Sequence, residues 1–172
     1  FLKSVIISLE AVVDFSKQLA SEAEKSANKT TDEKRKKELK TIADNLKVVP
    51  EYPARTFWQG VQATWLIHLL MHIEQNGFSI SVGRIDQYLY PLYKKDLEKG
   101  ILDEEFAFEL MQNFYVKCME ITIGGLKISL TQTVTLGGRD KNGNDMSNDL
   151  TLLCIKADRA TQMVQPQTTL RW

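Results

Sequence analysis

Hydroxyl side chains alternate with apolar ones in the short segment 78–82, Phe-Ser-Ile-Ser-Val. This period of two predicts a strand with one apolar and one polar face. Ser79 and Ser81 would share the polar face, where their hydroxyls could orient a hydroxylated or carboxylated substrate by hydrogen bonding. Neighbouring backbone could satisfy the same hydroxyls instead, and the sequence leaves both interpretations open.

Two histidines, His68 and His72, stand four residues apart with Glu74 nearby, so a metal pair has to be considered. The glutamate of an HExxH motif is absent, and the flanking residues are apolar. We therefore expect hydrogen-bonded histidines in a core or an interface, and we assign no metal ligand.

Three other polar groupings have structural interpretations. Arg84 and Asp86 could form a catalytic pair, but an ion pair that fixes the end of the strand is the preferred interpretation. Segment 140–145 resembles a calcium loop, yet Gly143 falls two places early for an EF-hand, which favours a turn. Cys118 and Cys154 lie in apolar helical patterns and are expected to be reduced core thiols.

The composition indicates a globular protein of the cytoplasm. Lys plus Arg and Asp plus Glu number 22 each, so no net charge draws the chain to nucleic acid or to an anionic membrane. No apolar run approaches the ~20 residues of a membrane span, and residues 1–4 do not resemble a signal peptide.

The elements that position these residues alternate between helices and strands. Helices are expected over residues 1–27, from a capping box at Thr30, from Thr56 to 76, after Pro91, from Asp103 to 121 and over 147–160. Strands are expected at 78–82, 128–136 and 168–172. This order predicts a helix-rich parallel α/β architecture, with a helical segment 1–76 followed by strand–helix units over 77–172.

Several blocks resemble the pyruvate formate-lyase domain of glycyl radical enzymes, and the resemblance extends over residues 1–172. The strongest part runs from Pro53 to Pro91. The matching blocks are 52–58, 67–68, 74–91, 95–96, 100, 135–138, 145–150, 165–166 and 170–171.

That resemblance implies a fragment of a large α/β barrel enzyme of anaerobic metabolism. In this family a partner activase that uses S-adenosylmethionine and an iron–sulfur cluster installs a glycyl radical, and the radical passes to a cysteine that attacks the substrate. Neither cysteine of this chain lies in such a loop, and Cys154 is expected to face a core. We therefore assign no catalytic residue and no bound cofactor to this internal segment, which alone is expected to be inactive.

By the same resemblance, the segment supplies pocket wall. Phe78 and Ser79 are expected closest to the substrate, and Thr131 and Thr133 on the second strand are weaker candidates. The alternation in 78–82 adds Ser81, on the same strand face as Ser79. Pyruvate formate-lyase carries small alanines at 78 and 79, so pyruvate cleavage is disfavoured.

The implied reaction is radical cleavage of a C–O, C–N or C–C bond in a small polar metabolite, as in dehydratases and lyases. A formate acetyltransferase is the alternative within the family, and a non-catalytic paralogue or helical interaction module is the alternative outside it. The expected partners are a small-molecule substrate, the activase and a second copy of the full-length protein in a homodimer.

Overall fold

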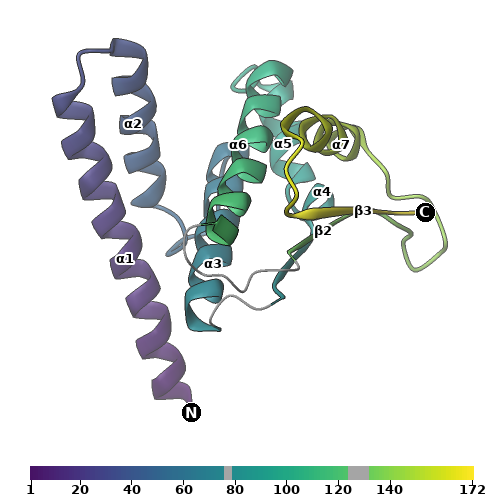
Figure 1. The fold of residues 1–172 in the computed structure, drawn as a ribbon, viewed down its shortest axis with the longest axis horizontal. Helices are drawn as coiled ribbons and strands as arrows, with labels where there is room; N and C mark the ends of the chain where they lie inside the picture. The colour runs from purple at the N-terminus through teal and green to yellow at the C-terminus, as the bar shows by residue number, and fades with distance from the viewer. Residues whose placement is uncertain (76–78, 124–131) are drawn as a thin grey trace. The chain divides into compact units, whose positions relative to one another are not determined.

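The computed structural model describes residues 1–75, 79–123 and 132–172 of the chain (Figure 1). The chain divides into two compact units, Phe1–Arg55 and Thr56–Trp172. None of the described helices has both the length and the hydropathy of a membrane span.

The first unit is a pair of helices, α1 (Leu2–Lys29) and α2 (Glu33–Leu46), which lie side by side (Figure 1). The buried hydroxyl oxygen of Ser16 lies 2.8 Å from the backbone carbonyls of both Leu46 and Val49. This contact ties the end of α2 to the middle of α1.

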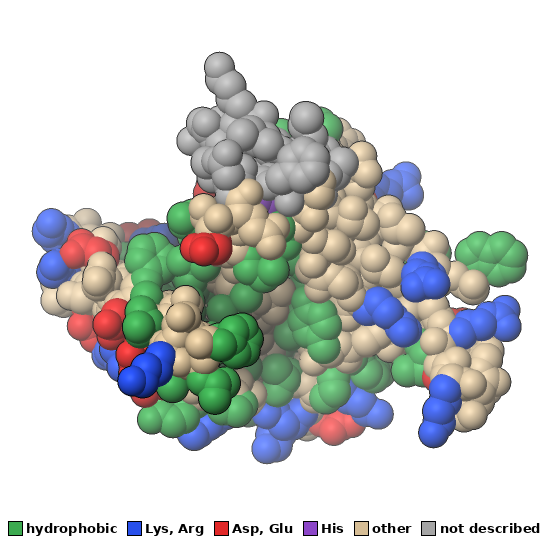
Figure 2. Space-filling model, turned by 90° about the horizontal axis from the view of Figure 1, so that it is seen from below, with side chains coloured by type: hydrophobic (Ala, Val, Ile, Leu, Met, Phe, Trp, Pro, Cys, Tyr) green, Lys and Arg blue, Asp and Glu red, His purple; other side chains and the backbone are tan. Residues whose placement is uncertain are grey.

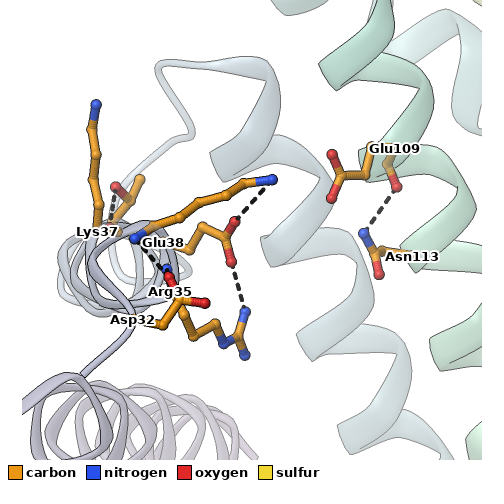
Figure 3. A network of polar contacts seen from close by, with 8 residues as sticks. Asp32, Arg35, Lys37, Glu38, Glu109 and Asn113 are labelled. Carbon is orange, nitrogen blue, oxygen red and sulfur yellow. Dashed lines mark hydrogen bonds and ion pairs between the residues drawn. The ribbon is translucent and has the colours of Figure 1, made fainter. Parts of the chain in front are cut away.

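The N-terminal cap of α2 differs from the one expected. The carboxylate of Asp32, instead of the hydroxyl of Thr30, accepts hydrogen bonds from the backbone N–H groups of Lys34 and Arg35 (Figure 3). Thr30 accepts from the N–H of Asp32, so it shapes the turn before the helix. The expected capping box was wrong because an aspartate two residues later offers a stronger acceptor in reach of the same amides.

The N-terminal half of α1 leaves its apolar side chains exposed, as Figure 2 shows from the side on which α1 begins. The exposed large residues are Phe1, Leu2, Val5, Ile6, Ile7 and Leu9. The period near 3.6 of the apolar residues therefore predicted the helix correctly, although α2 covers only part of its apolar stripe.

The second unit contains a parallel three-stranded sheet in the order β1-β2-β3. Its strands are β1 (Ser81–Arg84), β2 (Thr133–Gly137) and β3 (Gln167–Arg171). Its helices are α3 (Phe57–Glu74), α4 (Ile85–Tyr88), α5 (Tyr90–Glu98), α6 (Glu104–Ile123) and α7 (Asp149–Thr161). The predicted helix-rich parallel α/β class is confirmed.

Several helix ends are where local chemistry predicts them. The hydroxyl of Thr56 accepts from the N–H of Gln59 and caps α3. Pro91 lies in the first turn of α5, and Asp103 accepts from the N–H of Phe106 at the start of α6. These ends were predictable because each signal residue lies within one turn of the helix end that it marks.

The first strand begins later than expected, at Ser81 instead of residue 78. Ser79 has φ 52°, a left-handed conformation that does not continue a strand. The register then shifts between Ser81 and Gly83, where Gly83 has φ 72°. A bulge of this kind breaks the period of two, so the simple alternation was wrong across this segment.

One face of the sheet packs against the helices, with Val134 and Leu136 of β2 fully buried. Figure 1 shows α6 and α7 lying to one side of the strands. The largest fully buried side chains of this core include Phe57, Ile85, Met111, Phe114, Tyr115 and Leu150. The core therefore holds the sheet from one side.

Gly137 ends β2 in a position that a side chain cannot occupy. Its φ is 66°, and an added Cβ would lie 2.7 Å from the backbone oxygen of Arg171 on β3. We expect Gly137→Ala to lower the free energy of unfolding by roughly 2–4 kcal/mol, because left-handed strain and a backbone clash add together.

Gly143→Ala provides the control for this substitution, measured by denaturant unfolding. Gly143 also has a positive φ, 84°, but nothing lies within 4 Å of an added Cβ. Strain alone should cost about 1 kcal/mol there. Equal losses for the two variants would show that the contact with Arg171 is unimportant.

Candidate functional site

Hydroxyl side chains gather on the sheet face opposite the core. Thr133 and Thr135 are half-buried and alternate along β2 with the fully buried Val134 and Leu136. The register pairs Thr133 with Ser81 on β1, and Thr135 with Thr169 on β3. Paired residues of neighbouring strands project to the same side of a sheet. We call the group Ser81, Thr133, Thr135 and Thr169 the hydroxyl face.

The structure brings together two of the five predicted site residues, Ser81 and Thr133. Ser79 is exposed and precedes the strand, so it does not share a strand face with Ser81. Phe78 and Thr131 lie outside the described residues. Sequence reasoning missed Thr135 and Thr169. The alternation of hydroxyl and apolar residues over 133–136 would have identified Thr135.

Ser81 also connects two strands. Its hydroxyl donates to the backbone oxygen of Thr133 at 2.8 Å and accepts from the N–H of Gly83 at 3.3 Å. Backbone therefore engages this hydroxyl, and one oxygen lone pair remains able to accept a further hydrogen bond. Ser81 also lines a hollow of about 370 Å³ between α3 and β1, whose other polar members are Thr64, His68 and Tyr88.

Gln132 directly precedes Thr133 of the hydroxyl face in the chain, and its side chain is completely buried. Its side-chain Nε2 donates to the backbone oxygen of Cys118 at 2.9 Å, and its Oε1 lies 2.7 Å from Nε2 of His68. Its backbone N–H donates to Oε1 of Gln165, and its backbone oxygen accepts from the N–H of Gln167. The residue before Thr133 thus joins α3, α6 and the start of β3.

The hydrogen bonds assign the proton on His68. Because Nε2 of Gln132 faces a carbonyl, its Oε1 must face His68, so Nε2 of His68 carries the hydrogen. Burial lowers the pKa of His68 to about 4, against the opposing effect of the Gln132 hydrogen bond. The neighbouring His72 lowers this pKa further. His68 is therefore a neutral donor at physiological pH.

The interpretation of both histidines as hydrogen-bonded core residues is confirmed. His72 is fully buried, and its Nδ1 lies 2.8 Å from the backbone oxygen of His68. The two rings meet edge to face at 4.2 Å between centroids. Within residues 1–75, 79–123 and 132–172, no three metal-ligating side chains come together.

Asp86 fixes the carboxyl end of the sheet, but without the expected ion pair to Arg84. Its Oδ2 accepts from the N–H of Gly137 at 2.7 Å and from the hydroxyl of Thr151 at 2.5 Å. The guanidinium of Arg84 instead packs beside Gly138. No ion pair joins Arg84 to Asp86 in the described part of the chain. The expected pair was therefore wrong: neutral donors engage Oδ2 of Asp86, and the guanidinium of Arg84 lies against Gly138.

The segment at 140–145 is a turn, as expected. The carboxylate of Asp140 accepts from the backbone N–H groups of Asn142 and Asn144 and from the side-chain amide of Asn144. These donors, the Asn144 side chain first, lower the pKa of Asp140. The loop's own amides thus occupy the oxygens that a calcium site would use.

Both cysteines are core thiols. Cys118 lies in α6 and Cys154 in α7, and both are fully buried and free. Burial raises the pKa of Cys118 to about 12 and raises that of Cys154 as well. Neither thiol lies on the hydroxyl face.

Known proteins align with nearly the whole chain. Isethionate sulfite-lyase of Nitratidesulfovibrio vulgaris is 38% identical over 99% of this chain and 22% of its own length. A solved structure concerned with 1,2-propanediol dehydration in Roseburia inulinivorans is 38% identical, with a TM-score of 0.91 over 100% of this chain and 22% of the other. A glycyl radical enzyme from Archaeoglobus fulgidus is 34% identical, with a TM-score of 0.86 over 95% of this chain and 22% of the other.

These relatives agree with the family match. The chain spans about a fifth of the length of each. The family model for pyruvate formate lyase-like proteins matches residues 1–172. The chain therefore belongs to the pyruvate formate lyase-like family of glycyl radical enzymes.

Proposed function

We propose that this chain is a segment of a glycyl radical enzyme that cleaves a C–O, C–N or C–C bond in a small polar metabolite. Its hydroxyl face forms part of the wall of the substrate pocket. The observation that carries this proposal is the one-sided packing of the sheet: helices bury Val134 and Leu136, and the opposite face displays Ser81, Thr133, Thr135 and Thr169. Dehydratases and lyases among the relatives support the reaction class.

The radical chemistry belongs to the rest of the enzyme. A glycyl radical, installed by an S-adenosylmethionine-dependent activase, would supply the hydrogen-abstracting power when the full protein is activated. The buried Cys118 and Cys154 do not fit a part in it. We further propose that the full-length enzyme is a cytoplasmic homodimer.

The role of the hydroxyl face is to orient the substrate. Thr133 can donate to or accept from a substrate hydroxyl, and Ser81 can accept one hydrogen bond while its own hydroxyl continues to donate to the Thr133 carbonyl. Holding a reactant in one orientation lowers the entropic part of the barrier. By family resemblance, Phe78, Ser79 and Thr131 contribute to the same wall.

The test is Thr133→Val in the full-length enzyme, activated anaerobically and assayed with a panel of small polyols, amino alcohols and hydroxy acids. Valine keeps the size of threonine and removes its hydroxyl. We expect kcat/KM for the best substrate to fall roughly tenfold, because ~1.4 kcal/mol of transition-state stabilisation corresponds to tenfold in rate. The glycyl radical signal in electron paramagnetic resonance should stay at the wild-type level.

Thr168→Val is the matched control. Thr168 lies on the same sheet but faces the core, with its hydroxyl 3.4 Å from that of Tyr115. The kcat/KM of the Thr168→Val enzyme should stay within twofold of wild type. The pocket assignment is wrong if Thr133→Val behaves like Thr168→Val, and the enzyme assignment is wrong if activation yields neither radical nor turnover.

A further inference from the structure

We propose that Gln132 is a positioning residue, which acts together with His68 to hold Thr133 at the place where it meets the substrate. This inference rests on the proposed function, because it assigns a purpose to the buried polar contacts next to the hydroxyl face. Gln132 itself does not lie on that face, since it precedes Thr133 and is completely buried.

The backbone around Thr133 is held from both sides. Its carbonyl accepts the hydroxyl of Ser81 on β1 at 2.8 Å. The carbonyl of Gln132 accepts the N–H of Gln167 on β3 at 2.8 Å. These bonds fix Thr133 between its neighbours, but they do not fix how far β2 lies from the helices.

The side chain of Gln132 sets that distance. It reaches Nε2 of His68 on α3 at 2.7 Å and the carbonyl of Cys118 on α6 at 2.9 Å. One bond crosses from the strand entrance to α3, 64 residues away in the sequence, and the other to α6, 14 residues away, and both partners are buried. Thr133 is therefore anchored to the helical layer through the residue directly before it.

An apolar side chain would be the simpler way to fill a buried position. A buried amide is costly unless its hydrogen bonds are satisfied, and a fully bonded one specifies a single arrangement. The same applies to His68, which is 3% exposed and stays neutral. Around its ring lie His72 from its own helix, Gln132 directly before β2, and Ser81 and Tyr88 across the adjoining hollow. The buried polar pair Gln132 and His68 therefore defines the position of β2 more narrowly than apolar side chains would.

A double-mutant cycle in the full-length, activated enzyme distinguishes positioning from general support. The variants are Gln132→Met, Thr133→Val and the pair together, with kcat/KM as the readout. Methionine nearly matches the length of glutamine and removes both hydrogen bonds. We expect Gln132→Met to lower kcat/KM roughly tenfold in the wild-type background and less than twofold when Val already replaces Thr133. A structural role alone would give equal losses in both backgrounds.

His68 supplies a second pair of variants in case Gln132→Met does not fold. His68→Gln keeps a donor for Oε1 of Gln132, whereas His68→Leu removes it. The expected kcat/KM of His68→Gln is within threefold of wild type, and that of His68→Leu is roughly tenfold lower, with equal radical content in both. Equal activity of the two variants overturns the inference.

The outcomes separate this inference from the proposed function. If Thr133→Val alone has no effect, the substrate role of the hydroxyl face fails, and the inference fails with it. If Thr133→Val lowers kcat/KM but the loss from Gln132→Met is unchanged in its presence, only the positioning role of Gln132 is wrong.

Discussion

Replacing Asp86 with alanine is expected to lower the free energy of unfolding by about 3–5 kcal/mol. The carboxylate is fully buried, and its Oδ2 accepts from the N–H of Gly137 and from the hydroxyl of Thr151. Its backbone oxygen also accepts from the side chain of Asn148, the cap of α7. Alanine would leave two buried donors without a partner at the place where β2 ends and α7 begins.

Denaturant unfolding of the full-length protein measures this effect, with Asp44→Ala as the control. Asp44 is exposed and pairs with Lys47 on the surface of α2, so its loss should cost less than about 0.5 kcal/mol. The loss of unfolding free energy for Asp86→Asn should lie between those of the two alanine variants, because its side-chain oxygen can still accept from Gly137 and Thr151. A loss for Asp86→Ala no larger than that for Asp44→Ala would mean that Asp86 does not hold the sheet.

The second large effect is a loss of stability in mild acid caused by His68. Its folded-state pKa of about 4 lies below the ordinary value of 6.5, because burial disfavours the charged ring. The unfolded chain therefore takes up this proton first as the pH falls. The stability that the neutral His68 contributes is fully present above pH 6.5, and it decreases as the pH falls from 6.5 to 4. The loss should reach about 3 kcal/mol at the lower end.

The matched variant is His68→Gln, which cannot titrate and keeps a donor toward Gln132. Unfolding free energies of wild type and variant should be compared at pH 7, 5.5 and 4. The difference between the two proteins should shift in favour of the variant by about 3 kcal/mol over this range. Carboxylates with lowered pKa, such as Asp140, affect both proteins equally and cancel in the comparison. Parallel pH curves for the two proteins would contradict a buried neutral His68.

Local elements of the fold were predictable because their signals lie within one turn of the residues they affect. Thr56 caps α3, Pro91 opens α5 and Asp103 opens α6, as expected. The expected cap at Thr30 failed where Asp32 competed for the same amides. The expected start of β1 failed because the left-handed Ser79 and the bulge at Gly83 depend on how the strand meets β2.

The candidate site was predictable only in part. Alternating hydroxyls pointed to Ser81, and family resemblance pointed to Thr133, but their pairing depends on strand register. Thr169 could not be placed beside Thr135 before the order β1-β2-β3 was known. The same holds for Arg84 and Asp86, which are close in sequence yet contact different groups.

The sequence by itself determined the family, through the resemblance of its ordered blocks. It also determined the parallel α/β class, several helix ends and the presence of hydroxyl-bearing strands, which follow from residue type and from spacings of two to four residues. Only the tertiary structure decided which hydroxyls meet and what holds them. Gln132 reaches His68 across 64 residues, and Asp86 reaches Thr151 across 65. Contacts between residues so far apart in the chain depend on the packing of whole elements, and no local pattern encodes them.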